Sequence, residues 1–285
     1  MLSLGGRLAR VESQGVLSEV LMVVGVGVLS AGLRSLRHPA FFRAGTFGFV
    51  LTSFLAGWLI GGNLWTGLGF ASTWFLLPWL EILTRVRKMR LPLDRSLESC
   101  APPPRATFPA FPELSDEMET GGFEYVEDVS WTHGDTRQFY RLFRSGDRST
   151  GGAICLVEQS EFMFYFIALR SRASDGRILV TWNYPFSYGL HQLPKMIVNR
   201  AGGEKSIEEI ILLHRAFLER ETGEGLCPLE ASSVRRDIQD DLRRQLDHNL
   251  ACGILKNTGD STIGYTVRGM FFLWFQFLKD FVRFS

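Results

Sequence analysis

Two apolar segments that lie next to each other constrain this chain more than any other feature of its sequence. Residues 46–61 and 64–83 are each about as long as an α-helix that crosses a ~30 Å hydrocarbon layer at ~1.5 Å per residue. Only Gly61, Gly62 and Asn63 separate their apolar parts, so we expect a tight antiparallel helical hairpin. A buried hairpin in a soluble protein is the alternative.

Basic residues flank the predicted hairpin on both sides, and its turn is neutral. Arg34, Arg37 and Arg43 precede it, and a denser basic cluster follows at residues 85–95. Cytoplasmic flanks of membrane helices are enriched in Lys and Arg. We therefore predict a multi-pass protein of the inner cell membrane, with the soluble part of the chain facing the cytoplasm.

Residues 16–33 form a third apolar segment, whose uninterrupted apolar stretch begins only after Glu19. It is interpreted as a further membrane span, which completes a membrane region over residues 1–98. A cleaved signal peptide and a helix lying in the membrane plane are the alternatives. Arg34 directly follows the segment, and a positive charge there argues against export.

Charge and cysteine usage exclude several classes of function. The net charge is only +1, which offers no basic face for the phosphates of a nucleic acid. The four cysteines are far apart and contain no C-x-x-C pair, so neither a zinc site nor a redox dithiol is expected. We expect free thiols, no metal and no cofactor.

The second half of the chain predicts an α+β domain. Residues 99–112 include Pro102, Pro103 and Pro104, which favour an extended spacer. The domain proper is placed at residues 113–226. Short segments rich in aromatic and β-branched residues run from Phe123 to about Asn199, separated by turn residues. They predict a cytosolic antiparallel β-meander of about five or six strands, packed by helices.

Residues 206–221 have the pattern of an amphipathic helix that begins with a capping box of Ser206 and Glu209. His214 falls on its apolar face, where a buried imidazole needs hydrogen-bond partners. We interpret it either as a core histidine bonded to a strand carbonyl or an Asn side chain, or as a ligand-contacting residue. Trp182 and Asn183, at the end of a strand, would then form the other side of the pocket.

A charged amphipathic helix is predicted over residues 227–258. Its apolar residues recur every four positions and include Val234, Ile238, Leu242 and Leu246. This narrow stripe either packs against the domain or binds a protein partner or a second copy of the chain.

The end of the chain, residues 263–285, predicts an amphipathic helix at the membrane interface. Its run of about ten apolar residues before Lys279 is too short for a span, and its broad apolar face suits an in-plane helix. Packing into a soluble core is the alternative. An interfacial helix would hold the domain to the membrane at both ends. The residues expected at the interface are Trp65, Trp79, Arg85, Arg87, Lys88, Trp274, Lys279 and Arg283.

Residues 113–221 resemble a bacterial family of membrane-anchored α+β domains that has no assigned activity. The resemblance rests on Gly122, Phe123, Ser174, Asp175, Gly176, Arg177, Leu179, Val180, Thr181, Trp182, Asn183, Ser206, Glu209, Ile210, His214 and Arg215. Domains of this family often follow a transmembrane hairpin that ends in a Pro-Trp segment, and residues 77–80 resemble that segment. The resemblance implies an architecture and supplies no catalytic residues.

These features predict a membrane-tethered binding or accessory module without catalytic residues. No G-x-S-x-G elbow, H-E-x-x-H or other catalytic motif occurs in the sequence. A membrane-associated hydrolase or lipid-modifying enzyme with a site near His214, Trp182 and Asn183 is one alternative. A structural subunit of a membrane complex is the other.

Overall fold

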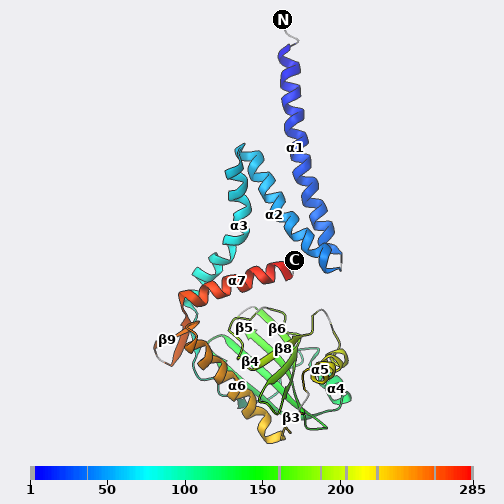
Figure 1. Ribbon diagram of the computed structural model, residues 1–285, viewed down its shortest axis with the longest axis vertical. Coiled ribbons are helices and arrows are strands. Elements are labelled where there is room, and N and C mark those ends of the chain that lie inside the picture. Colours follow the sequence, from blue (N-terminus) through cyan, green and yellow to red (C-terminus); the bar gives the residue numbers. More distant parts are fainter. Residues whose placement is uncertain are drawn as a thin grey trace. The chain divides into compact units, whose positions relative to one another are not determined.

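The computed structural model describes residues 4–36, 38–159, 162–186, 188–202, 205–222, 225–259 and 261–283. The chain forms two compact units (Figure 1). Residues 1–89 and 267–285 make up the first, called the helical unit here. Residues 90–266 make up the second, called the sheet unit.

The helical unit contains α1 (Leu4–Ser35), α2 (Pro39–Gly61), α3 (Leu64–Thr84), the 3₁₀ turn η1 (Val86–Lys88) and α7 (Val267–Arg283). The predicted hairpin is confirmed as a pair of helices. Gly62 takes the left-handed conformation that ends α2, and the Asn63 side chain accepts a hydrogen bond from the Thr66 N–H at 3.0 Å to begin α3. Helix α2 begins earlier than predicted, because Pro39 suits a first helical turn.

Small residues let the helices of this unit approach closely. A Cβ atom added at Gly57 would lie 2.7 Å from the Thr66 carbonyl oxygen of α3, and one added at Gly48 would overlap the Ser30 side chain of α1. Close backbone approach at small residues is typical of packed membrane helices. Trp74 adds a hydrogen bond from its Nε1 to the Ser53 hydroxyl at 2.8 Å.

Two described helices are long and apolar enough to cross a membrane, namely Leu17–Ser35 of α1 and Ala40–Gly61 of α2. Only 6% and 17% of their most apolar stretches are buried, unlike the core helices of a soluble protein. Helix α3 does not reach the same hydropathy, although its segment was one of the two strongest predictions. Polar residues such as Thr66, Ser72 and Thr73 lower the mean hydropathy of α3.

The main sheet of the sheet unit has seven strands in the order β2-β3-β4-β5-β6-β7-β8. Their bounds are β2 (Glu98–Ser99), β3 (Phe123–His133), β4 (Thr136–Ser145), β5 (Thr150–Gln159), β6 (Phe162–Arg172), β7 (Ile178–Trp182) and β8 (Met196–Arg200). The predicted antiparallel meander is confirmed from β3 to β7, and β2 adds an edge strand that was not predicted. Strand β8 pairs with β7 in parallel. A parallel pair requires a connection that returns the chain to the end of the sheet where the first strand began, and the segment between Trp182 and Met196 makes that return.

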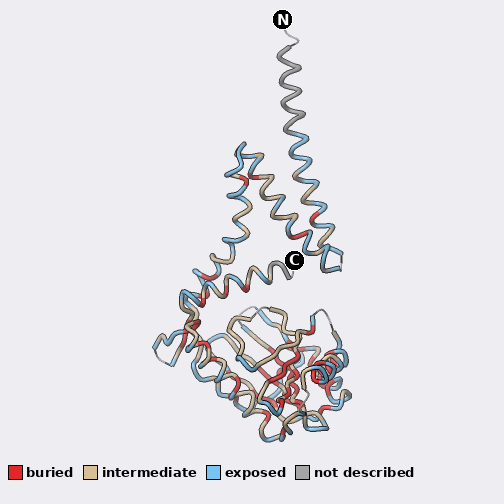
Figure 2. The backbone as a smooth tube through the Cα atoms, in the orientation of Figure 1, coloured by how far each residue is buried: buried red, intermediate tan, exposed pale blue. Residues whose placement is uncertain are grey.

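Helices cover both faces of this sheet (Figure 1). Helices α4 (Phe111–Thr120) and α5 (Ile207–Glu221) pack on the face that carries Phe139, Phe143 and Ile154. Helix α6 (Ala231–Ala251) packs on the opposite face, where Val234 joins a core with Tyr140 and Leu142. Side chains of successive strand residues alternate between faces, so the sheet buries both (Figure 2).

A second, three-stranded sheet was not predicted. It has the order β1-β10-β9, with β1 (Leu91–Pro92), β9 (Leu255–Gly259) and β10 (Thr262–Tyr265). Leu91 is paired with Ile263 in an antiparallel register. Strand β1 follows η1 closely, and β10 leads almost directly into α7. The two connections to the helical unit therefore enter the sheet unit as neighbouring strands.

The Pro-rich segment at residues 99–112 is part of the domain and not the predicted spacer. The Cys100 N–H donates to the Asp128 carbonyl at 3.0 Å, and Phe108 is only 3% exposed in the core beside Phe111. Its apolar residues find a place against the sheet, which composition alone does not reveal. The charged helix is likewise shorter than predicted, because β9 and β10 occupy residues 255–265.

Ion pairs and apolar contacts together attach α6 to the sheet. Asp241, buried on α6, pairs with Arg170 of β6 and more distantly with Arg172 at 3.7 Å. Burial raises the pKa of the Asp241 carboxyl, and these arginines with Arg244 oppose that rise. Val234 and Ile238 pack on the sheet and Leu246 is 2% exposed, so at least three of the four stripe residues proposed for a protein partner are already covered by the chain itself.

Candidate functional site

The sheet unit contains a cavity of about 530 Å³ between α5 and two turns, a volume typical of small-molecule sites. The turns are Gly121–Gly122, at the end of α4, and the β4–β5 turn. The residues that line it are Gly121, Gly122, Phe123, Ser145, Gly146, Asp147, Ser149, Thr150, Leu169, Ile211, His214, Arg215, Leu218, Glu219, Thr222 and Leu226. This cavity is the candidate site.

Asp147 organises the β4–β5 turn at the mouth of the cavity. Its Oδ1 accepts hydrogen bonds from the Ser145 hydroxyl at 2.5 Å, the Ser149 N–H at 3.0 Å and the Ser149 hydroxyl at 2.9 Å. Burial alone would raise the pKa of this carboxyl, but the three hydrogen bonds and the nearby Arg215 guanidinium lower it below its ordinary value. The turn therefore presents a carboxylate at neutral pH.

His214 is buried on α5, as the apolar face of that helix predicts, with 2% of its surface exposed. The capping box of Ser206 and Glu209 that begins the helix is present. The His214 Nδ1 lies 2.9 Å from the Thr181 hydroxyl of β7, and its Nε2 lies 3.1 Å from the Ser171 hydroxyl of β6. Its partners are thus hydroxyls of neighbouring strands, and not the expected carbonyl or Asn side chain.

These hydroxyls continue as a chain of contacts to Asp147. The Ser171 oxygen lies 2.8 Å from the Thr150 hydroxyl, which lies 3.3 Å from the Ser149 hydroxyl, and Ser149 donates to Asp147. A carboxylate only accepts. If every pair is bonded, each hydroxyl donates toward Asp147, and His214 must carry its proton on Nε2 and accept from Thr181 at Nδ1.

Burial keeps this imidazole neutral. Removing the ring from water lowers the pKa of His214 from 6.5 to about 4. Its Ser171 partner is also 2% exposed, so the Ser–His pair does not offer a nucleophile to a substrate in the cavity. The geometry suits a site that is held in shape by hydrogen bonds more than one that performs acyl transfer.

The charged residues of α5 complete the rim. Arg215 and Glu219 are one helical turn apart, and both are exposed and line the cavity. Together with Asp147 they place charges of both signs around an opening whose interior contains Leu169, Ile211 and Leu218. A ligand with polar ends and an apolar body would match this distribution.

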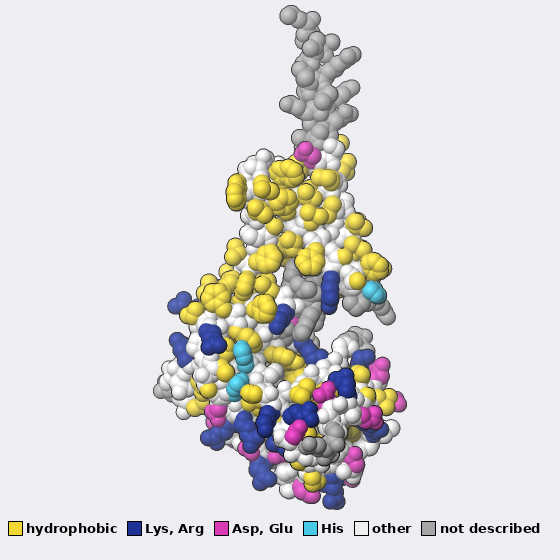
Figure 3. Space-filling view, in the orientation of Figure 1, with side chains coloured by type: hydrophobic (Ala, Val, Ile, Leu, Met, Phe, Trp, Pro, Cys, Tyr) yellow, Lys and Arg dark blue, Asp and Glu magenta, His cyan; other side chains and the backbone are white. Residues whose placement is uncertain are grey.

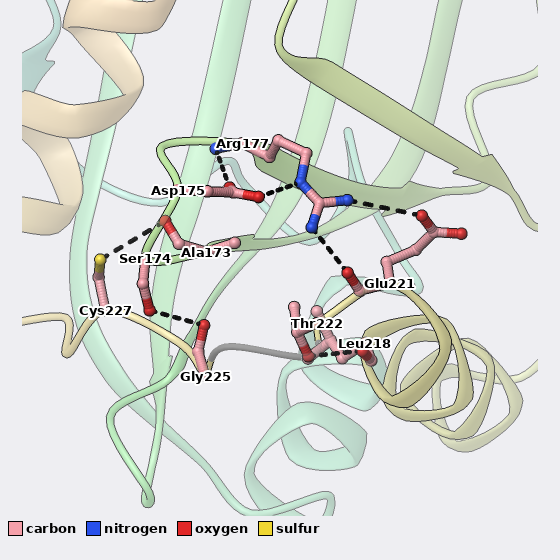
Figure 4. Close-up of polar contacts among 9 residues, drawn as sticks. All are labelled: Ala173, Ser174, Asp175, Arg177, Leu218, Glu221, Thr222, Gly225 and Cys227. Atoms are coloured by element: carbon pink, nitrogen blue, oxygen red, sulfur yellow. Dashed lines mark hydrogen bonds and ion pairs between the residues drawn. The ribbon is translucent and has the colours of Figure 1, made fainter.

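The turn at residues 173–177 is bonded to the end of α5 and to the segment that follows it (Figure 4). Arg177 donates from its guanidinium to Asp175 at 2.5 Å and to the Glu221 carbonyl at 2.8 Å. The Ser174 hydroxyl donates to the Gly225 carbonyl at 3.0 Å. These contacts hold the chain on both sides of the lining residues Thr222 and Leu226.

The structure separates the three residues predicted to share a ligand site. Thr181 points toward His214, so Trp182, the next residue, faces the other side of the sheet and packs with the core beneath α6. The Asn183 side chain accepts from the Ile167 N–H at 2.6 Å and extends the sheet. Only His214 lines the cavity. The turn residues Asp147, Ser149 and Thr150, which the sequence indicated only as a hairpin, line it instead.

The residues predicted at a membrane interface lie in the helical unit. Trp65 is 79% exposed at the start of α3, and Trp79 contacts the rings of Phe271 and Trp274 on α7. Arg85 pairs with Glu81 at 3.4 Å, and the Lys279 ammonium lies 4.6 Å from the centre of the Phe275 ring. Arg87 and Lys88 form η1, and the side chain of Arg283 lies outside the described residues.

Among the residues that the structure describes, no three His, Cys, Asp or Glu side chains gather as a metal site. The four cysteines are free thiols. Comparison of the chain with family models, with curated proteins and with solved structures gives no match. The resemblance drawn from the sequence therefore brings no function to this cavity.

Proposed function

We propose that this chain is an integral membrane protein that holds a small-molecule-binding module at the cytoplasmic surface of the inner membrane. The supporting observation is the apolar surface of the helical unit, where Trp65, Ile60 and Val28 are 79%, 74% and 68% exposed. Hydrophobic side chains cover the described part of α1 after residue 16 together with α2 and α3, whereas charged side chains are concentrated on the sheet unit (Figure 3). A contiguous apolar surface of this kind marks a membrane or protein contact, and the presence of two helices of membrane-spanning length favours lipid.

The orientation follows from the basic residues beside the helices. In this proposal α1, α2 and α3 span the bilayer, and the positive flanks before α2 and after α3 stay in the cytoplasm. The sheet unit, which follows the second flank, lies on the same side.

The binding module is the cavity beside α5. Its ligand is a small molecule with polar ends, held by Asp147 and Arg215 at the rim and by apolar contacts below. The proposed role is non-catalytic, because burial keeps His214 neutral and its Ser171 partner is itself buried and does not line the cavity. Self-association through Val234, Ile238, Leu242 and Leu246 is a separate proposal that the packing of α6 does not favour.

Extraction of membranes tests the location. Full-length protein should stay in the membrane pellet after alkaline carbonate and be released by detergent. Release by carbonate alone would count against the membrane proposal. A reporter domain fused after Ser285 should be active only when it is a cytoplasmic reporter, and activity of a periplasmic one would reverse the orientation.

A further inference from the structure

The sheet unit exposes few large apolar side chains, and half of these are concentrated at one place. Six described residues of this unit belong to the class: Leu93, Tyr125, Phe162, Met163, Tyr165 and Leu212. Three of the six lie within four positions at the start of β6, next to the β5–β6 turn. We call Phe162, Met163, Phe164 and Tyr165 the aromatic tip.

The aromatic tip is a packed structure on both faces of the sheet. Phe162 and Phe164 contact the ring of Phe186 at centroid distances of 5.7 and 5.1 Å. Tyr165, on the opposite face, contacts Phe108 at 5.0 Å. Yet Phe162, Met163 and Tyr165 remain 52%, 49% and 43% exposed. The tip is therefore a supported apolar surface that the rest of the sheet unit leaves uncovered.

A run of contacts joins the aromatic tip to the point where the chain leaves for α7. Tyr265, at the end of β10, donates from its hydroxyl to the Gly189 carbonyl at 3.1 Å. Tyr184 is close enough to Tyr265 to affect its hydroxyl electrostatically. The Tyr184 ring in turn contacts Phe164 at 5.8 Å. Tyr184 and Gly189 thus link the exit of the chain to the tip.

The connections on this side are short. Only Met89 and Arg90 lie between η1 and β1, and only Thr266 lies between β10 and α7. One residue spans at most about 3.6 Å, so the strands β1 and β10 begin and end close to the helices of the helical unit. If those helices lie in a bilayer, the end of the sheet unit near Tyr265 lies at its surface.

We infer that the aromatic tip contacts the lipid of the same bilayer, at the level of the headgroups. Tyr165 suits that layer because its ring is apolar and its hydroxyl is polar, and Phe162 and Met163 supply the apolar area that inserts at the headgroup boundary. The surface is an additional lipid contact in the middle of the chain, separate from the helices. This inference rests on the proposed membrane location.

Photo-crosslinking in the full-length protein tests the lipid contact. Benzoyl-phenylalanine is placed at Phe162, and in a matched variant at Leu212, which is similarly exposed at 55% but lies on α5. Both variants are reconstituted into vesicles of phosphatidylethanolamine and phosphatidylglycerol, irradiated and analysed by mass spectrometry. Lipid adducts should be roughly tenfold more abundant at position 162, because a residue in the headgroup layer meets lipid continuously.

Two outcomes would overturn the inference. Equal lipid yields at positions 162 and 212 would remove the special role of the tip. Protein adducts in place of lipid adducts at position 162 would assign the surface to a protein.

A second probe at Met163 replaces the first if the Phe162 variant does not fold. Carbonate extraction of the same variants distinguishes failure of the lipid contact from failure of the membrane location. A protein that resists extraction but gives no lipid adducts contradicts only the lipid contact. A protein that carbonate extracts contradicts the membrane location itself.

Discussion

The indole N–H of Trp274 donates to the backbone carbonyl of Phe75 at 2.8 Å, across 199 positions of the chain. The carbonyl lies one turn before Pro78, in a stretch of α3 that lacks one helical N–H donor. Trp79, directly after that proline, packs on Phe271 and Trp274. The last helix of the chain is therefore attached to α3 within the helical unit, while Phe271 and Phe275 stay exposed.

Replacing Trp274 tests this attachment. Trp274→Phe keeps an aromatic ring but removes the N–H donor, and a lost hydrogen bond of this kind costs about 1 kcal/mol. We expect faster proteolytic removal of α7 from protein in detergent micelles, and faster still for Trp274→Ala. Phe275→Ala, at an exposed position of the same helix, is the control. Equal cleavage rates for all variants would show that the contact does not hold α7.

Gly57 and Gly69 form a matched pair for testing the hairpin. A Cβ atom at Gly57 would lie 2.7 Å from both the Phe70 side chain and the Thr66 carbonyl oxygen, whereas one at Gly69 would meet nothing within 4 Å. Gly57→Leu should therefore separate α2 from α3 and lower the thermal stability of the solubilised protein. Gly69→Leu should behave as wild type. A similar loss in both would attribute the effect to helix composition and not to close packing.

The buried His214 predicts a pH dependence of stability. Its pKa is about 4 in the folded protein and 6.5 when it is exposed, so between these values the unfolded chain binds the extra proton. The stabilisation is complete above pH 6.5 and is lost as the pH falls toward 4. It amounts to about 3 kcal/mol at most. Thermal unfolding from pH 7.5 to 4.5 measures it.

The His214→Gln variant should lose part of this pH dependence. His133→Gln, at the half-exposed end of β3, is the control for replacing a histidine outside the core. A His214 variant whose unfolding temperature falls with pH as steeply as that of the wild type would assign the effect to other groups.

The ion pair between Asp241 and Arg170 is expected to matter most when only one partner is removed. Asp241→Leu leaves the Arg170 guanidinium with only the more distant Asp237 carboxylate at 3.7 Å, so we expect a loss below the roughly 3–5 kcal/mol of a fully unpaired buried charge. The double variant with Arg170→Met removes both charges and should recover most of the stability. Denaturant unfolding of the wild type, of each single variant and of the double variant gives the coupling energy between the two side chains. A double variant no more stable than Asp241→Leu would contradict the interpretation.

Local patterns predicted those parts of the fold that depend on neighbours in sequence. The turn at residues 61–63 and the Ser206 capping box are both set by a few adjacent residues, and so are the hairpins from β3 to β6. The burial of His214 also followed from helical periodicity. Each of these features needs only the chemistry of one short segment.

Features that depend on distant pairings were missed. Leu91 meets Ile263 in strands too short to show an alternating pattern. The parallel register of β8 depends on the path of a loop, and Phe108 finds its core only after the sheet exists. The cavity joins residues of α5 to turns that are 60 or more positions earlier, so no spacing in the sequence indicates it. Trp182 faces the core beneath α6, because side chains alternate along β7 and the neighbouring Thr181 contacts His214.

The pairing of β1 with β10 changes what a double attachment means for this chain. Two anchors at opposite ends of a domain would be independent, so that either one could hold the domain if the other were lost. Here both segments that connect the two units belong to one short pair of strands, β1 and β10. Pro92 of the edge strand β1 has no backbone N–H to donate to this pair. Loss of that pairing would free both connecting segments at once, because Leu91 and Ile263 are paired within it. The three-stranded sheet therefore couples the two connections to the helical unit.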